Sequence, residues 1–301
     1  MDRSVGQPRR RVAAGARGRR RRDRADTMTA ETQPMPHTVG SLAADLRDLG
    51  LSTGDTVLVH ASTRSLGFVA GRVQAVVRAL LEVVGPGGTL AVPTHTPFNS
   101  DPAGWRNPPV PPRWWPVIRE QSPGFDPRCT PSQHMGVLAE TVRTWPGAVR
   151  SGHPSVSFAA VGDRARAIVG GHRLDQPLGE NSPVGALYRA HGKVLLLGCG
   201  HDRNTSLHLA ESRRPQAPMM DYGAAVADGE GGSRWVTWTA PVTDASDFPV
   251  IGAAYEAVGA IAVGPVGSAV ARLMPQRDVV DFATSWMEDH RPPKTACRMS
   301  T

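Results

Sequence analysis

Two side chains, His208 and Glu211, have the types and the spacing that suit proton transfer. The apolar run Val194–Leu197 predicts a buried strand that ends at the turn 198–200, and segment 204–211 is expected to begin a helix. Residues three apart share one face of a helix, so this imidazole and carboxylate can meet. A neighbouring carboxylate fixes the tautomer of an imidazole and raises its basicity. The pair therefore predicts a general base.

The elements around this pair predict a layered α/β domain. Short apolar strands are expected at Thr56–His60 and Thr89–Val92, alternating with helices over 41–50 and Val73–Val84. The first of these helices is predicted to have Ser41 as its N-cap and Gly50 beyond its end. This alternation favours a central, mostly parallel sheet flanked by helices.

The remaining elements include a hairpin and several helices. Segment Ala224–Ala240, turning at Asp228–Ser233, predicts a small β-hairpin elaboration. Further helices are expected over 132–145 (capped by Ser132), Asp163–Val169, Val184–Ala190 (after a Ser182-Pro183 cap), Val250–Ile261, Ser268–Met274 and Val279–Asp289. Segment 97–131 is rich in proline and has no periodicity, but its tryptophans indicate a long ordered loop.

The net charge of +7 is confined to one end of the chain. Residues 1–27 contain ten arginines and three aspartates, so residues 28–301 are balanced and form the single folded domain that we expect. The arginine-rich segment has too few large apolar residues to fold, and we expect a disordered extension. It is interpreted as an inert tail, or as an upstream extension with translation starting at Met28; an arm that binds RNA is the alternative.

Cysteines and hydropathy point to a cytoplasmic protein. Cys129, Cys199 and Cys297 are far apart and form neither a CxxC pair nor a zinc-ligand spacing, so no metal is expected. So few cysteines fit a reducing compartment. The chain has no run of 18 apolar residues and no apolar segment typical of a signal peptide after the arginines. No membrane association is therefore expected.

Three further passages accompany the segment that contains His208. In chain order the four are Val57–Gly67 (VLVHASTRSLG), Gly85–Thr94 (GPGGTLAVPT), Arg150–Phe158 (RSGHPSVSF) and Val194–Glu211 (VLLLGCGHDRNTSLHLAE). Together they resemble the aminoglycoside N3-acetyltransferases of the antibiotic N-acetyltransferase family. The resemblance extends from about Leu42 to about Asp289, which is most of the chain.

The resemblance implies a fold and an activity. The fold would be that of the antibiotic N-acetyltransferases, and the activity would be acetyl-CoA-dependent acetylation of the 3-amino group of aminoglycosides. His208 would be the general base that deprotonates the 3-ammonium, with Glu211 orienting it. The same chemistry on another amine of a biosynthetic intermediate is the alternative, and a homodimer is left open.

The resemblance also implies where acetyl-CoA would bind. The turn after the first strand would hold pantetheine and pyrophosphate through hydroxyls, backbone amides and the charge of Arg64. Its residues are Ser62, Thr63, Arg64, Ser65, Leu66 and Gly67. A second group would lie along the same cofactor: Arg150, His153, Ser157 and Phe158. Taken alone, these segments are equally consistent with an ordinary βα loop and a rigid His-Pro turn.

Aminoglycosides carry several ammonium groups, so carboxylates are expected to bind them. The candidates are Asp101, Glu180, Asp202, Asp244 and Asp247. Each of these acids could equally be a solvated surface residue.

Motifs of other enzyme classes are incomplete or absent. The Gly198-x-Gly200 pair lacks the third glycine of a dinucleotide-binding loop, because Arg203 occupies that position. The chain has no GxSxG elbow and no GxxxxGK[ST] loop. The acyl-CoA signature of the commoner N-acetyltransferase superfamily is also missing, since Arg64 to Gly67 continues with Phe68 and Val69. Acetyl transfer here would therefore use a different fold.

Overall fold

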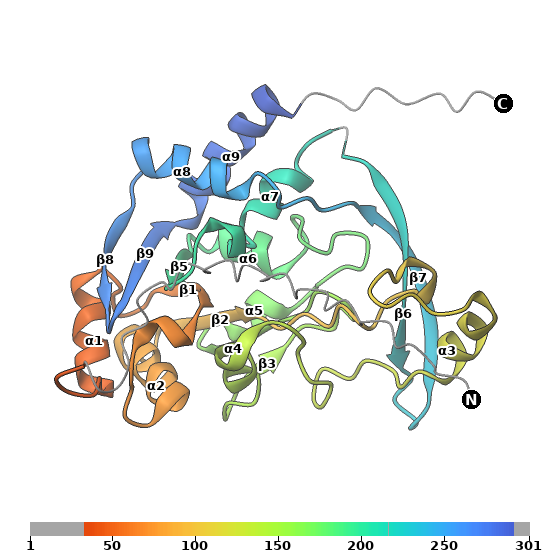
Figure 1. Ribbon diagram of the computed structural model, residues 1–301, viewed down its shortest axis with the longest axis horizontal. Coiled ribbons are helices and arrows are strands. Elements are labelled where there is room, and N and C mark those ends of the chain that lie inside the picture. Colours follow the sequence, from red (N-terminus) through yellow and green to blue (C-terminus); the bar gives the residue numbers. More distant parts are fainter. Residues whose placement is uncertain (1–32, 216, 292–301) are drawn as a thin grey trace, which may run out of the picture.

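The computed structural model describes residues 33–215 and 217–291, which build one seven-stranded sheet and one separate hairpin (Figure 1). The order of strands across the large sheet is β3-β4-β2-β1-β5-β9-β8. Its strands are β1 (Thr56–Ala61), β2 (Thr89–Pro93), β3 (Val149–Arg150), β4 (Phe158–Gly162), β5 (Lys193–Leu197), β8 (Ala262–Val266) and β9 (Ala269–Pro275).

Parallel pairing forms the centre of this sheet. β1 pairs in parallel with β2 on one side and with β5 on the other. The flanking strands β3, β4, β8 and β9 pair antiparallel. The predicted α/β fold class is therefore confirmed, and the carboxyl ends of β1, β2 and β5 meet at one edge, where α/β proteins place their ligands.

Alternate residues of the central strands face two different helical layers. Val57 and Val59 of β1 pack with α1 (Val39–Asp48), α2 (Arg72–Val84) and α4 (Gly136–Arg143). Leu58 points the opposite way and belongs to a core with α5 (Ala165–Val169) and α6 (Pro183–Arg189). Val194 and Leu196 of β5 pack instead with α7 (Leu207–Ser212), α8 (Phe248–Val258) and α9 (Gln276–His290). The period of two in burial explains why these short runs form strands covered on both faces.

The hairpin and the proline-rich loop pack together at one end of the molecule (Figure 1). β6 (Met219–Ala227) and β7 (Ser233–Pro241) pair antiparallel, as predicted. The loop 97–131 contains two 3-10 turns and the helix α3 (Trp115–Gln121). Backbone hydrogen bonding of Phe125 to Ala225, with an N–O distance of 2.9 Å, joins the loop to β6. The loop is therefore ordered against the hairpin.

Several expectations are wrong in detail. Segment Ser268–Met274 is not a helix, because Ala269, Ala271 and Leu273 alternate inward in strand β9. Ser132 does not cap the helix expected over 132–145, because α4 begins only at Gly136. The sequence patterns did not indicate strands β3, β4 and β8. The first helix begins at Val39 with Thr38 as its N-cap, and Ser41 occupies the third helical position of the capping box.

Some expectations lie outside the described residues. They concern the arginine-rich segment 1–27, the start at Met28 and Cys297. Within 33–215 and 217–291, no helix is both long and apolar enough to cross a membrane.

Candidate active site

Helix α7 carries His208 to the edge where the parallel strands end. β5 ends at Leu197, and Gly198 then turns the chain with a φ of 68°. A Cβ at Gly198 would lie 1.8 Å from the Oγ of Ser65, so only glycine permits this close approach. The turn after β1 and the turn after β5 are therefore in direct contact, and His208 follows from the second of them.

His208 and Glu211 form the predicted pair. The Nδ1 of His208 lies 2.8 Å from the Oε2 of Glu211. The other carboxylate oxygen, Oε1, accepts hydrogen bonds from the Nη1 of Arg291 at 2.7 Å and from the backbone N–H of Asp244 at 2.8 Å. Arg291 also donates to both carboxylate oxygens of Asp247. Glu211 is thus fixed by groups from α9 and from the segment before α8.

These contacts determine how the imidazole is oriented. The side chain of Glu211 is 5 % exposed, and the Arg291 guanidinium beside it supports the ionised carboxylate. Because an ionised carboxylate only accepts hydrogen bonds, the Nδ1 of His208 must donate. The lone pair of the neutral imidazole is then on Nε2. The ring of Phe248, with its centroid 4.7 Å away, packs against the imidazole.

His208 lines a cavity of about 650 Å³ at the end of the parallel strands. The predicted cofactor residues Ser62, Thr63 and Arg64 line this cavity, as does the predicted substrate residue Asp202. Ser65, Leu66 and Gly67 continue the same turn, where Leu66 is buried in the core. The structure therefore brings the turn after β1 to the predicted base.

Several cavity residues were missed by the sequence analysis. His60, His95, His134, Cys199, Asn204 and Thr205 also line it. His60 could have been predicted, because it lies at the end of an apolar strand, at the edge where ligands bind in α/β folds. His95 and His134 lie in or near the proline-rich loop, where no periodicity indicates which side chains face the site.

Two of these histidines are held neutral. Burial, with a smaller contribution from the nearby His208, lowers the pKa of His60 to about 3 and that of His95 to about 3. Their Nε2 atoms have no hydrogen-bond partner among the described residues. Neither ring competes with His208 for a proton in the neutral pH range.

A second cavity, of about 320 Å³, borders His208 and Glu211 from the other side. It lies between the loop 175–181 and the end of β7, and the predicted substrate residue Glu180 lines it. Glu180 is paired with Arg213, whose Nε is 2.7 Å from its Oε1. His208 is therefore accessible to two separate volumes.

The second group of predicted cofactor residues lies outside both cavities. Arg150 and Ser157 meet at Thr94: the Nε of Arg150 donates to Ser157 Oγ at 3.0 Å, and its Nη2 donates to the Thr94 carbonyl at 2.6 Å. His153 is buried, and its Nδ1 accepts from the backbone N–H groups of 155 and 156. Phe158 is fully buried, with the ring of His95 edge-on to it.

The other candidate carboxylates make contacts of their own. Asp101 pairs with Arg119 at 2.8 Å and accepts from the N–H of Ala103. Asp202 is half exposed and pairs with Arg203 at 3.0 Å. The carboxylate of Asp247 binds Arg291, and that of Asp244 accepts from the N–H of Ser246 at 3.0 Å. Asp244 and Asp247 thus lie beside the groups that hold Glu211.

Cys199 has the environment of an inert thiol. Burial is the main reason that its pKa is raised to about 11. Its Sγ lies 3.4 Å from the carbonyl oxygen of His60. The thiol therefore stays protonated at neutral pH, which leaves His208 as the group placed for proton transfer.

The chain is similar to known proteins of one family. The family model for aminoglycoside 3-N-acetyltransferase matches residues 58–288. The SPbeta prophage-derived aminoglycoside N(3')-acetyltransferase-like protein YokD of Bacillus subtilis is 41 % identical over 85 % of this chain and 94 % of its own length. Aminoglycoside N(3)-acetyltransferase VII of Streptomyces paromomycinus is 37 % identical over 84 % of this chain and 92 % of its own.

Solved structures agree with this relationship. The crystal structure of YokD from Bacillus subtilis superposes with a TM-score of 0.83 at 40 % identity, covering 87 % of this chain and 97 % of that one. The structure described as AAC-IIIb binary with CoASH has a TM-score of 0.76 at 33 % identity, with 85 % and 98 % covered. One described as AAC-VIa bound to sisomicin has a TM-score of 0.76 at 32 % identity, with 85 % and 99 % covered. Sequence, fold and site together show that the chain belongs to the aminoglycoside 3-N-acetyltransferase family.

Proposed function

We propose that this protein transfers the acetyl group of acetyl-CoA to the 3-amino group of an aminoglycoside. The observation that carries the proposal is the position of His208, which is paired with an ionised Glu211 and borders two cavities. Two cavities that share His208 can together hold two substrates next to the same base. Relatives of similar fold bind CoASH and sisomicin, which supports this choice of substrates.

His208 would supply the base that the chemistry requires. An ammonium group has no lone pair, so it must lose a proton before it can attack a carbonyl carbon. The Nε2 of His208 would take that proton, and Glu211 would stabilise the imidazolium. The amine nitrogen would then bond to the thioester carbon as the C–S bond breaks. The thiolate of coenzyme A would take the second proton that the nitrogen loses and leave as the thiol, and His208 would release its proton to solvent.

Acetyl-CoA would bind along the turn after β1. Ser62, Thr63 and Arg64 line the larger cavity, and Thr63 and Arg64 also line an adjoining pocket of about 370 Å³ that reaches Arg72. Within the described part of the chain, neither Arg64 nor Arg72 forms an ion pair, so both guanidinium groups are free to bind phosphate. These residues fit the pyrophosphate of the cofactor.

Carboxylates that border His208 would bind the ammonium groups of the aminoglycoside. Of the predicted acids, Asp202 lines the larger cavity and Glu180 lines the smaller one. Asp244 and Asp247 would act indirectly, through the contacts that hold Arg291 and Glu211. Because acetyl-CoA is a cytoplasmic metabolite, we place the reaction in the cytoplasm.

The test is a thiol-release assay with acetyl-CoA against a panel of aminoglycosides. We expect release of one thiol per acetylated drug, with the acetyl group located on the 3-amino nitrogen by NMR. An aminoglycoside that lacks the 3-amino group serves as the matched control and should give no release. If no aminoglycoside causes thiol release although calorimetry shows that acetyl-CoA binds, the proposed substrate is contradicted. Another amine would then be the acceptor.

A further inference from the structure

A cavity lined by arginines lies away from the cavities that His208 borders. It has a volume of about 950 Å³ and is formed by the end of α4, strand β3, the end of α5 and the segment near 127–128. Its lining shares no residue with either of the cavities that contain His208. Five guanidinium groups line it: Arg128, Arg143, Arg150, Arg166 and Arg173. We call this volume the arginine cavity.

The charged side chains that line the arginine cavity are all positive. Among the described residues that line it, none is an aspartate or a glutamate. Three of the arginines pair with carboxylates outside the lining: Arg128 with Asp126 at 2.7 Å, Arg143 with Glu140 at 2.5 Å and Arg173 with Asp175 at 2.7 Å. The other two, Arg150 and Arg166, form no ion pair within the described part of the chain.

Arg150 is a partly buried cation without a counter-ion. All of its hydrogen bonds go to neutral oxygens: the hydroxyls of Thr94 and Ser157 and the carbonyls of Thr94 and Thr130. Its pKa is lowered to about 10, mainly by burial, which reflects how poorly this charge is compensated. An anion in the arginine cavity would compensate it.

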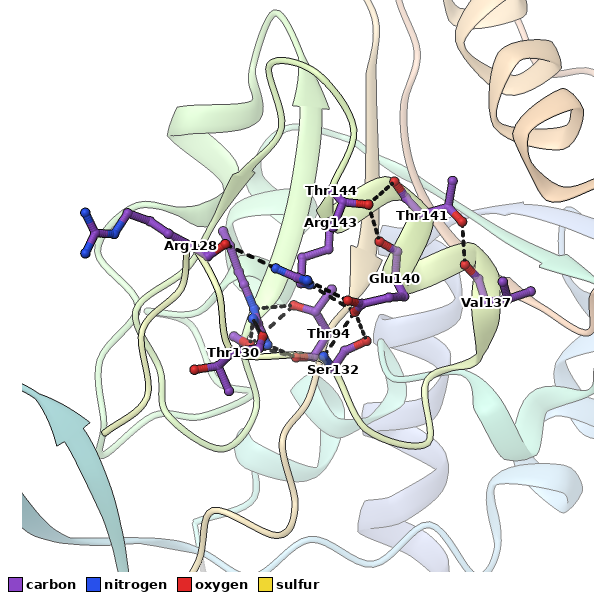
Figure 2. A network of polar contacts seen from close by, with 11 residues as sticks. Thr94, Arg128, Thr130, Ser132, Val137, Glu140, Thr141, Arg143 and Thr144 are labelled. Atoms are coloured by element: carbon purple, nitrogen blue, oxygen red, sulfur yellow. Dashed lines mark hydrogen bonds and ion pairs between the residues drawn. The ribbon is translucent and has the colours of Figure 1, made fainter. Parts of the chain in front are cut away.

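Hydrogen bonds hold the guanidinium group of Arg143 in place before any ligand arrives. Figure 2 shows Glu140 between Ser132 and Arg143, with the Oε2 of Glu140 accepting from Ser132 Oγ at 2.7 Å. Arg143 continues to the Arg128 carbonyl, with an N–O distance of 3.4 Å. This network joins α4 to the segment 128–132 and fixes the guanidinium group of Arg143 on Glu140, so that group needs little reorganisation to bind a ligand.

The floor of the arginine cavity leaves room for a ligand. Gly152 and Gly171 line it, and a Cβ added at either one would meet no atom within 4 Å. His172 contributes no charge, because burial lowers its pKa to about 4. Both of its ring nitrogens are also engaged, Nδ1 with Ser151 Oγ at 2.9 Å and Nε2 with the Pro177 carbonyl at 2.8 Å. Recognition would therefore depend on the arginines.

We propose that the arginine cavity binds a phosphorylated small molecule that carries two or more phosphate groups. A planar guanidinium matches two oxygens of a phosphate at once, and Arg150 and Arg166, which form no ion pair among the described residues, provide two such groups in one cavity. The volume is in the range of a small-molecule site. This site is separate from the one proposed for acetyl transfer and does not depend on that activity.

The test is a calorimetric titration of the full chain with inorganic pyrophosphate at constant ionic strength. The variant Arg166→Gln/Arg173→Gln removes two cavity arginines that lie outside the network of Figure 2. We expect its dissociation constant for pyrophosphate to be at least about tenfold larger than that of the wild type. The matched control, Arg47→Gln/Arg78→Gln, removes two exposed arginines from α1 and α2 and should bind as the wild type does.

A second variant separates this site from the cofactor site. Arg64→Gln/Arg72→Gln alters the region where we place the pyrophosphate of acetyl-CoA, and it should retain tight binding of free pyrophosphate to the arginine cavity. The proposal is overturned if wild type binds no pyrophosphate, or if Arg166→Gln/Arg173→Gln binds it unchanged while its thermal midpoint shows a folded protein. Acetyl transfer by that variant, which should be normal, is measured separately, so failure of one proposal does not decide the other.

Discussion

Two histidines of this protein, the partly buried His208 and the fully buried His153, differ in their neighbours. His208 has a carboxylate 2.8 Å from its Nδ1. The Nδ1 of His153 accepts instead from two backbone N–H groups at 3.2 Å, and its ring packs against Trp238 and His172. Burial lowers the pKa of His153 to about 3. Burial thus holds the imidazole of His153 neutral, whereas His208 has a carboxylate beside it that can compensate a positive charge on its ring.

Removing the proposed base is the most direct test of this difference between the two histidines. We expect His208→Ala to lower kcat by about 100- to 10,000-fold, because the two buried imidazoles of the cavity, His60 and His95, are held neutral and cannot replace the base. The measurement is thiol release under saturating substrates, with binding of CoA followed by calorimetry and expected to change little. A variant that keeps a near-normal kcat would remove His208 from the proposed role.

The carboxylate can be neutralised while its shape is kept. Glu211→Gln should lower kcat by about 10- to 100-fold, since the imidazolium would lose its counter-charge. For the same reason the acid limb of the pH profile of kcat/KM should move to lower pH. A purely structural role for Glu211 would instead lower the amount of folded enzyme and leave the position of that limb unchanged.

Arg291 tests whether the carboxylate itself must be held. Arg291→Gln removes the donors to Glu211 and Asp247. We expect kcat to fall about 3- to 10-fold and the free energy of unfolding to fall by about 1–3 kcal/mol. Arg272→Gln is the matched control, because Arg272 pairs with Glu256 at 2.7 Å and has no contact with Glu211. Equal losses of kcat in the two variants would argue against a positioning role for Arg291.

His153 gives the smallest effect, on stability and not on catalysis. Its folded pKa of about 3 is below the ordinary value of 6.5, so the unfolded chain binds a proton that the folded chain does not. This contribution to stability is fully present above pH 6.5 and is lost as the pH falls toward 3. His153→Asn keeps an acceptor near Nδ1 and should flatten that slope by about 1 kcal/mol per pH unit, measured by urea unfolding between about pH 4.5 and pH 6. A slope equal to that of wild type, or a loss of kcat like that of His208→Ala, would contradict the stabilising, non-catalytic role of His153.

Local sequence patterns were sufficient to predict the centre of the fold and the contact between His208 and Glu211. The apolar runs of β1, β2 and β5 predict buried strands, and the spacing of His208 and Glu211 on α7 brings them together through a single helical turn. The alternation of Ala269, Ala271 and Leu273 would have indicated strand β9, but the segment is short enough to be mistaken for a helix.

The partners that depend on tertiary structure could not be predicted in this way. Arg291 meets Glu211 across 80 positions of sequence, and nothing in its own segment indicates a carboxylate partner. Arg150 similarly contacts Thr94 across 56 positions. The periodicity of a segment specifies which face is buried, but it does not specify which distant segment lies there.

The contact between Arg291 and Glu211 also has a consequence for biogenesis. Ribosomes add residues in order, so His208 and Glu211 are synthesised 80 residues before the guanidinium that fixes them. Until α9 has emerged and docked, the carboxylate lacks its cationic partner and the imidazole lacks a fixed orientation. An elongating chain that has not yet reached Arg291 would therefore hold this carboxylate less firmly and catalyse more slowly than the longer chain.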